Sequence, residues 1–161
     1  TSGGNAAART RAADDLVITG SDFDFYNQSE GTFYIEDIPR ITGSTQIARF
    51  SLNDGTNATS MYSLVAASYD LLVKANGLTN IYNVGGGTPV PNALERFAFS
   101  YIVDEIKVSR DGALNNPANN PSTQAIPTVD RLHIGQIDGF TRNLNGRIRR
   151  LIFWPYHSEN L

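Results

Sequence analysis

The chain has 161 residues, a length that fits one domain able to bury its own hydrophobic core. It has 13 Lys and Arg against 16 Asp and Glu, which gives a net charge of -3. Its basic residues form no cluster except Arg147, Arg149 and Arg150, and nucleic acid is therefore not an expected partner, because phosphate binding needs clustered Lys and Arg. The absence of Cys excludes disulfides, thiolate metal sites and cysteine nucleophiles.

The ends of the chain and its longest apolar stretch give the domain limits. Residues 1–12 are small and polar, which is typical of a linker or N-terminal arm, and residues 13–161 are expected to form one domain. The first residue is Thr1 rather than Met, so we expect the chain to be part of a longer polypeptide. The stretch 63–73 is interrupted by polar residues and is too short for a membrane helix of ~18 residues, so no membrane insertion is predicted.

From residue 16 onward, apolar and polar residues alternate with the period of a β-strand. In the segment 32–36, for example, this alternation places Phe33 and Ile35 on one face and Tyr34 and Glu36 on the other. The pattern predicts strands over 16–19, 32–36, 46–52, 61–66, 69–75, 95–101, 105–110, 131–135 and 146–154. Many short strands without a sustained helical period predict an all-β sandwich or barrel.

Turn-forming residues separate these strands. Three pairs that tolerate positive φ predict tight hairpin turns, and they are Asp54-Gly55, Asn76-Gly77 and Asp111-Gly112. Pro39 should end its strand, and the Asn- and Pro-rich stretch 115–127 should be a loop. The only helical feature is 158–161, where Ser158 could cap a short terminal turn.

The last predicted strand breaks its own alternation. Ile148, Leu151 and Phe153 can all face inward only if a one-residue bulge occurs at Arg149-Arg150. Such a bulge would point both guanidinium groups outward and leave Trp154 on the solvent side. The alternative for Trp154 is that it covers the edge of the core, since Trp is highly buried on average.

Four segments in the second half occur in an order that resembles a known architecture. They are Phe97-Ala-Phe-Ser-Tyr101, Ile106-Lys-Val-Ser-Arg-Asp-Gly112, Leu132-His-Ile-Gly135 and Leu144-Asn-Gly-Arg-Ile-Arg-Arg-Leu-Ile-Phe-Trp-Pro155. This order resembles the concanavalin A-like and laminin-G-like jelly roll, in which a short turn similar to 158–161 follows the last strand. The resemblance implies an all-β fold, a two-sheet antiparallel jelly-roll sandwich.

Three N-terminal segments narrow the resemblance. They are Thr10-Arg-Ala-Ala-Asp14, Ile18-Thr-Gly20 and Phe25-Tyr-Asn-Gln-Ser-Glu-Gly-Thr32. They resemble tailed-bacteriophage virion proteins, in which such a module ends a tail-fibre, tail-appendage or capsid-decorating polypeptide. The resemblance implies a location at the virion surface, other virion proteins as partners and a homo-oligomer such as a trimer. Pro39 and the long loop from Asn115 depart from the family pattern.

The sequence offers no catalytic constellation. Related glucanases carry carboxylates in a Glu-x-Asp-x-Glu run, because retaining hydrolysis needs two carboxyl groups about 5–5.5 Å apart. Here Asp104 and Glu105 are adjacent and are expected to point to opposite faces of a strand. His133, predicted to be structural, and His157 have no nucleophile elbow nearby, and the run 85–87 lacks the P-loop Lys. A carboxylate pair assembled from distant strands stays open as the enzymatic alternative.

Binding sites are the remaining class. Calcium needs six to eight oxygen ligands, and the segment 53–57 offers some of them but is explained as a hairpin, so no cofactor is predicted. Glycan sites combine an aromatic face that stacks on a sugar ring with short polar side chains. The candidate residues for glycan contact are Tyr62, Tyr69, Tyr82, Trp154, Asn53 and Asp54. For each aromatic residue the alternative is half-burial in the sandwich.

These observations lead to three hypotheses. The first is a non-catalytic phage virion module that binds a cell-surface glycan and serves adhesion at the end of a tail or capsid-surface protein. The second is a structural decoration or oligomerisation domain whose interface covers Tyr62, Tyr69 and Trp154. The third is a polysaccharide-degrading enzyme.

Overall fold

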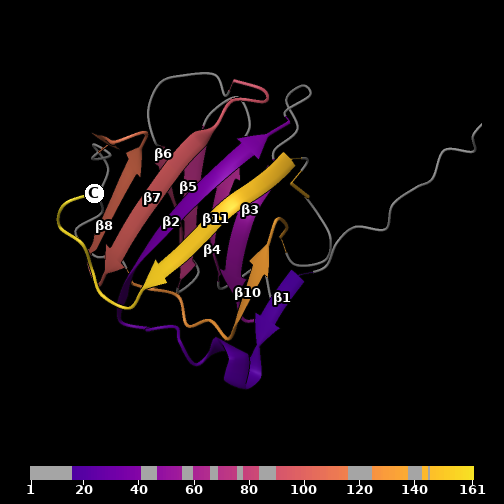
Figure 1. Cartoon of the computed structure of the whole chain (residues 1–161). Helices are drawn as coiled ribbons and strands as arrows, with labels where there is room; N and C mark the ends of the chain where they lie inside the picture. Colours follow the sequence, from indigo (N-terminus) through magenta and orange to yellow (C-terminus); the bar gives the residue numbers. More distant parts are fainter. Residues whose placement is uncertain are drawn as a thin grey trace, which may run out of the picture.

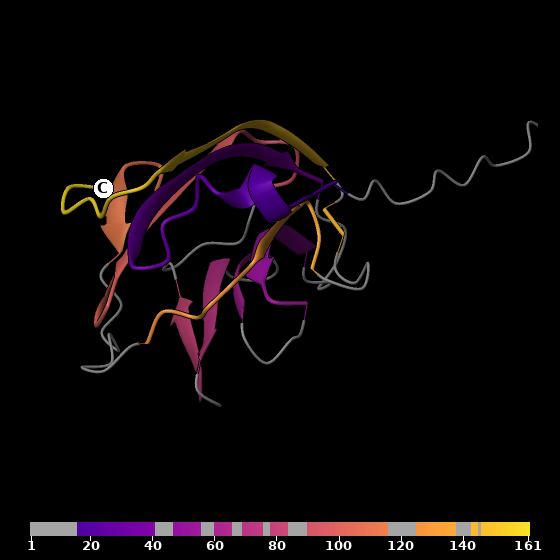
Figure 2. The same cartoon turned by 90° about the horizontal axis from the view of Figure 1, so that it is seen from below.

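The computed structural model describes residues 16–40, 47–55, 60–65, 69–75, 78–83, 90–115, 125–137, 143–144 and 146–161. Within these residues the chain forms two antiparallel sheets that pack face to face, as Figure 1 shows from the front and Figure 2 from below. This confirms the predicted all-β, two-sheet antiparallel architecture. The N-terminal arm predicted over 1–12 lies outside the described residues.

One sheet has six strands and the other has five. The six-stranded sheet has the order β1 (Leu16–Thr19), β10 (Arg131–Ile134), β3 (Ile47–Asn53), β4 (Ser60–Val65), β5 (Tyr69–Ala75) and β6 (Leu78–Asn83). The five-stranded sheet has the order β11 (Gly146–Trp154), β2 (Glu30–Pro39), β7 (Glu95–Ile102), β8 (Glu105–Arg110) and β9 (Ala113–Asn115). The helical element of the described residues is a single 3-10 turn, η1 (Gly20–Phe23).

Aromatic rings from both sheets meet in the core. Phe33 on β2 stacks on Phe99 of β7 with ring centroids 5.1 Å apart, and both rings stack on Phe50 of β3 at 5.3 and 5.5 Å. All three side chains are almost completely buried. Because aromatic burial supplies large apolar area, this stack contributes strongly to holding one sheet on the other.

Two glycines of the family-like segments lie where no side chain fits. A Cβ on Gly31 would lie 2.6 Å from both the Tyr101 hydroxyl and the Phe153 ring. A Cβ on Gly146 would lie 2.6 Å from the Ile38 carbonyl oxygen. These contacts give a packing reason for a glycine in two of the segments that carry the resemblance, 25–32 and 144–155.

The predicted strands all occur, and several predicted ends are confirmed. Strand β2 ends at Pro39, and the Asp111-Gly112 turn has φ angles of 49° and 82°. Residues 76–77 lie outside the described residues, but Ala75 pairs with Leu78 across the predicted connection. Two strands, β6 and β9, were not predicted, because one is mostly polar and the other has only 3 residues. In the predicted 115–127 loop, Asn115 ends β9 and residues 125–127 are not in a strand.

Three local predictions are wrong. Asn53 pairs with Ser60, so Asp54-Gly55 begins a longer connection rather than a two-residue hairpin. Asp104 lies in the turn before β8 with a φ of 66°, so it is not a strand residue opposite in direction to Glu105. Residues 158–161 form no helical turn, and the Ser158 hydroxyl donates to the Asn160 carbonyl oxygen at 3.1 Å instead of capping one.

The predicted bulge in β11 is confirmed. Ile148 pairs with Asp37 and Arg150 pairs with Glu36, which leaves Arg149 as the extra residue. Arg149 and Arg150 are both exposed, whereas Ile148, Leu151 and Phe153 pack against the core. The bulge therefore turns two consecutive arginines to the outer face of the five-stranded sheet.

Candidate functional site

The outer face of the five-stranded sheet carries a regular lattice of side chains. Phe33, Ile35 and Asp37 of β2 point inward, so Thr32, Tyr34 and Glu36 point outward. Cross-strand pairing sets each of them beside outward residues of β11, β7 and β8. The three rungs, from β11 across the sheet, are Trp154, Thr32, Ser100 and Lys107; then Ile152, Tyr34, Ala98 and Ser109; then Arg150, Glu36 and Arg96.

A cleft of about 430 Å³ opens on the middle rung. Its floor contains Tyr34, Ala98 and Ser109, and the small size of the last two leaves the space above them free. The wall residues come from both sides of this floor, and they include Trp154, Tyr156, Ser158, Asn160, Arg96 and Asp111. We call this feature the outer cleft.

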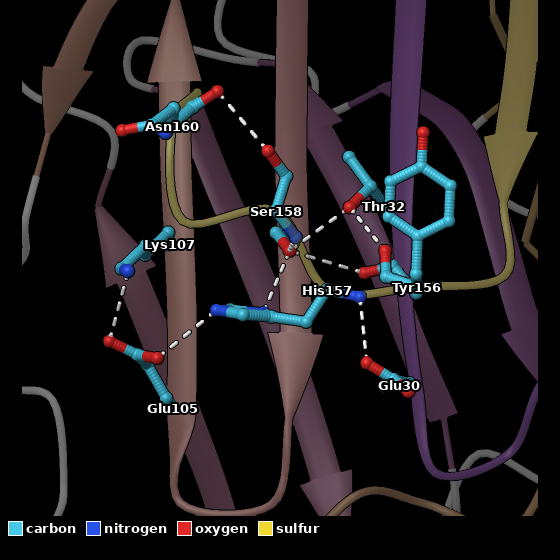
Figure 3. Close-up of polar contacts among 10 residues, drawn as sticks. Glu30, Thr32, Glu105, Lys107, Tyr156, His157, Ser158 and Asn160 are labelled. Atoms are coloured by element: carbon cyan, nitrogen blue, oxygen red, sulfur yellow. Dashed lines mark hydrogen bonds and ion pairs between the residues drawn. The ribbon is translucent and has the colours of Figure 1, made fainter.

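The chain after β11 forms one wall of the outer cleft, and side chains of the sheet hold it in place. Thr32 Oγ1 donates to the Tyr156 carbonyl at 2.8 Å, and Glu30 Oε2 accepts from the His157 N–H at 2.9 Å. Ser100 Oγ accepts from the Ser158 N–H. Figure 3 shows this segment crossing the outer face of the sheet. Three backbone groups of the wall are thus fixed by β2 and β7.

His157 adds a second contact between this wall and β7, and it connects the wall to one further strand, β8. Its Nδ1 lies 2.8 Å from Ser100 Oγ, and its Nε2 lies 3.1 Å from Glu105 Oε2, toward which Figure 3 shows it directed. Lys107 Nζ lies 3.3 Å from the other oxygen of Glu105. This cluster was not predicted from the sequence, because His157 meets Ser100 and Glu105 only after the chain has crossed the sheet.

The chain of contacts from Ser100 through His157 to Glu105 resembles the Ser-His-acid triad of a hydrolase, but this serine is not placed to act as a nucleophile. Ser100 is fully buried, and its oxygen already accepts the Ser158 N–H. The hydroxyl lies 3.0 Å from Thr32 Oγ1 as well as close to His157. A nucleophile needs access to a substrate carbonyl, so this hydroxyl acts as a structural anchor for the wall.

Charged groups lie at the opposite end of the outer cleft. The Arg96 side chain is 52% exposed, and its Nε lies 3.6 Å from Glu36 Oε1. The Tyr34 hydroxyl donates to the same oxygen at 2.7 Å, and this hydrogen bond is the main reason that the pKa of Glu36 is lowered. Desolvation is the main cause that raises the pKa of Tyr34. Asp111 Oδ1 accepts from the Arg96 backbone N–H at 3.0 Å, which fixes the turn beside the cleft.

A second charged cluster lies between the sheets. Arg49 donates through Nε to Asp37 Oδ2 at 3.0 Å and through Nη2 to Glu95 Oε2 at 2.6 Å. The three side chains are at most 3% exposed, and burial raises the pKa of Asp37 although Arg49 lowers it. Asp37 and Glu95 are the carboxylate pair from distant strands that the sequence left open. They are sealed in the core and do not line the outer cleft.

The candidate residues from the sequence do not converge on one place. Trp154 lies in the wall of the outer cleft and is not part of the core cluster. Asn53 is buried, and its side chain bonds Ser51 Oγ and the Gly55 N–H instead of facing solvent. Asp54 lines a different cleft of about 340 Å³ with residues 126–130.

Three tyrosine candidates lie on the opposite sheet. Tyr62 is on β4 across from Leu72, Tyr69 begins β5, and Tyr82 is on β6 across from Leu71. Their side chains lie outside the described part of the structure, so their role stays a prediction. Sequence reasoning missed Tyr34, Arg96 and Asp111 as cleft residues. The only signal for Tyr34 and Arg96 is outward alternation on strands that were not yet known to pair, and Asp111 was noted only as part of a turn.

Within the described residues, no group of three or more His, Asp or Glu side chains is placed to hold a metal ion. Residues 56 and 57 of the calcium candidate segment lie outside them. None of the helical structure described is long and apolar enough to cross a membrane.

No protein-family model and no curated protein matches the sequence. Among solved structures, the chain is similar to the CBM40 of the Ruminococcus gnavus IT-sialidase bound to α2,3 sialyllactose. The TM-score is 0.74 at 12% sequence identity, and the alignment covers 92% of this chain and 89% of that one. It is similar to the heptameric SAP-like pentraxin of Limulus polyphemus, with a TM-score of 0.66, 12% identity, and coverage of 94% and 75%. The chain has a concanavalin A-like jelly-roll fold.

A third likeness agrees with this fold. Domains LG4-5 of the mouse laminin α1 chain align with a TM-score of 0.69 and 8% identity, over 90% of this chain and 40% of that one. At such low identity the likenesses establish the fold alone. The resemblance to the concanavalin A-like and laminin-G-like jelly roll is therefore confirmed, and the bacteriophage context stays a prediction.

Proposed function

We propose that this chain is a carbohydrate-binding domain whose ligand lies in the outer cleft. The observation that carries the proposal is the composition of that cleft. Aromatic residues Trp154 and Tyr156 line it together with Arg96, Asp111 and Asn160, above a floor of small side chains. Sugars need both features, because their ring carbons stack on aromatic faces while their hydroxyls take hydrogen bonds.

The size of the outer cleft fits this role. Its volume of about 430 Å³ falls within the range of about 300–1,000 Å³ that small-ligand sites occupy. The anchored wall is a further support, since a site held by Thr32, Ser100 and His157 needs little ordering when a ligand binds. The CBM40 bound to sialyllactose provides an example of a glycan-binding domain with this fold.

We further propose that the domain binds a glycan without cleaving it. The cross-strand carboxylates Asp37 and Glu95 are held by Arg49 in the core, where a glycosidic bond cannot reach them. The carboxylate of Glu36 accepts from Tyr34 and lies beside Arg96, and both interactions keep it charged. A charged carboxylate has no proton to give, so Glu36 does not suit the general-acid role that cleavage of a glycosidic bond requires.

We propose that the domain lies at the surface of a phage virion, where it serves as an adhesion module for cell-surface glycans. This part of the proposal is supported by the resemblance of segments 10–14, 18–20 and 25–32 to tailed-bacteriophage virion proteins. The structural alternative needs one interface over Tyr62, Tyr69 and Trp154, and these residues lie on strands of different sheets. An upstream tail- or capsid-anchoring region in the parent gene would support the virion setting, and a parent gene without one would contradict it.

The test of glycan binding is a glycan array followed by calorimetric titration of the best ligand. Replacing the cleft aromatic residue, Trp154→Ala, is expected to weaken binding by roughly tenfold or more, because aromatic anchors at a site centre typically contribute about 2 kcal/mol. The matched control is Phe25→Ala, an exposed aromatic residue in a different cleft. Equal losses in both variants, or no glycan bound above background, would contradict the proposal.

A further inference from the structure

A stripe of three arginines extends from the outer cleft along β11. Arg147, Arg149 and Arg150 are all exposed, and regular pairing places Arg150 beside Glu36 on the outer face. Without the bulge, Arg149 and Arg150 would point to opposite faces and one of them would enter the core. The bulge instead gathers these charges on the face that carries the outer cleft. We call Arg147, Arg149 and Arg150 the basic stripe.

The basic stripe has little to neutralise it. None of its three guanidinium groups forms an ion pair with another described residue. By contrast, Arg96 pairs with Glu36, and Arg110 lies near Asp111. Strand pairing places Glu36 between Arg150 and Arg96. After the Tyr34 hydrogen bond, Coulombic attraction to Arg150, Arg96 and Arg149 also lowers the pKa of Glu36. This face is therefore locally positive on a chain whose net charge is -3.

The stripe is continuous with the cleft. Trp154 and Arg147 are ends of the same strand segment, which spans roughly 20 Å at ~3.4 Å per residue. Ile152 separates the aromatic wall from the arginines on the outward face of β11. A ligand that rests on Trp154 and continues as a chain in this direction would pass over the guanidinium groups.

We infer that the ligand is an acidic polysaccharide, with one sugar in the outer cleft and its neighbouring carboxylate-bearing units on the basic stripe. This inference rests on the proposed function and gives the ligand its chemical class. A guanidinium group presents paired N–H donors that match the two oxygens of a carboxylate, and a row of them suits a chain of repeated negative charges. A neutral glycan would use the cleft alone.

The experiment compares two probes that differ only in charge. Alginate, a polysaccharide of uronic acids, is titrated beside the same material after its carboxyl groups have been reduced to alcohols. We expect alginate to bind more tightly and to lose this advantage as salt rises, because salt screens exposed charges. The variant Arg149→Gln with Arg150→Gln should bind alginate about tenfold more weakly and the reduced probe unchanged.

Two further variants serve as controls. Arg149→Lys with Arg150→Lys keeps the charge and should retain most of the salt-dependent affinity. Lys74→Gln with Arg131→Gln removes the same charge from the six-stranded sheet and should bind like the wild type. Circular dichroism checks that each variant keeps its β-sheet content.

The outcomes separate this inference from the proposed function. Equal affinity for the two probes, or full alginate binding by the glutamine variant, overturns the inference and leaves glycan binding intact. If that variant only aggregates, the arginines merely protect the β11 edge. Duplex DNA that binds as tightly as alginate would assign the stripe to nucleic acid and also overturn it. Failure of the proposed function is different, because Trp154→Ala would then bind both probes like the wild type.

Discussion

Two clusters of charged residues, one on each side of the five-stranded sheet, are built from neighbours in the sequence. Glu36 and Asp37 are consecutive on β2, as are Glu95 and Arg96 on β7. Asp37 and Glu95 point inward and meet Arg49, whereas Glu36 and Arg96 point outward at the rim of the outer cleft. Similar residue types thus serve stability on one face and are free for contact on the other.

A bulge completes each cluster. In β3 the register shifts between Ala48 and Phe50, and both Arg49 and Phe50 are buried between the sheets. In β11 the shift lies between Ile148 and Arg150, and both Arg149 and Arg150 are exposed. A bulge sets two consecutive residues on one face, so a single extra residue decides whether an arginine is structural or available to a ligand.

The inner cluster should give the largest effect on stability. Arg49→Met removes the guanidinium group that the buried carboxylates Asp37 and Glu95 share, and we expect it to lower the free energy of unfolding by about 3–5 kcal/mol. Urea denaturation measures this loss. The control on the outer face, Arg96→Met, should change stability by less than about 1 kcal/mol, because exposed ion pairs contribute little. Similar losses of unfolding free energy in the two variants would contradict the different roles assigned to the inner and outer clusters.

The anchored wall should give an intermediate effect. Ser100→Ala removes a buried hydroxyl that contacts Thr32, His157 and the Ser158 N–H, and we expect a loss of about 1–3 kcal/mol. The Ser158 amide should also exchange with solvent faster than in the wild type. The control Ser109→Ala removes a hydroxyl on the cleft floor and should leave hydrogen exchange at Ser158 unchanged, because Ser109 does not contact the wall segment that Ser100 holds. Unchanged exchange at Ser158 would show that the wall is held by other contacts.

The smallest effect concerns the outer charges. Tyr34→Phe removes the hydrogen bond that lowers the pKa of Glu36, so this pKa should rise toward its ordinary value. A carboxyl with a lowered folded pKa stabilises the fold above its unfolded pKa. The small stability difference from the wild type should therefore exist at neutral pH and vanish as pH falls through the folded pKa. An NMR pH titration of the Glu36 carboxyl carbon measures the shift, and an unchanged pKa would contradict it.

The sequence predicted what depends on neighbours along the chain. Alternation located the strands, and the broken alternation around Ile148 and Leu151 located the β11 bulge. The outer cleft depends instead on pairing between distant strands, such as Tyr34 with Ala98, which alternation does not specify. Burial of Arg49 was not predicted, because its neighbours in the sequence do not show that it faces Asp37 and Glu95 on the other sheet. Among the candidate residues whose side chains the structure describes, Trp154 alone lines the outer cleft.

The central claim is that the outward residues of the five-stranded sheet form the glycan site. The most direct test is a ¹⁵N–¹H NMR titration of the wild-type protein with its tightest glycan from the array. The account predicts that shifts concentrate on the Trp154 indole and on the Arg96 and Ala98 amides, while the buried Arg49 amide stays unchanged. Shifts concentrated on β4, β5 and β6, with the Trp154 indole unmoved, would contradict it.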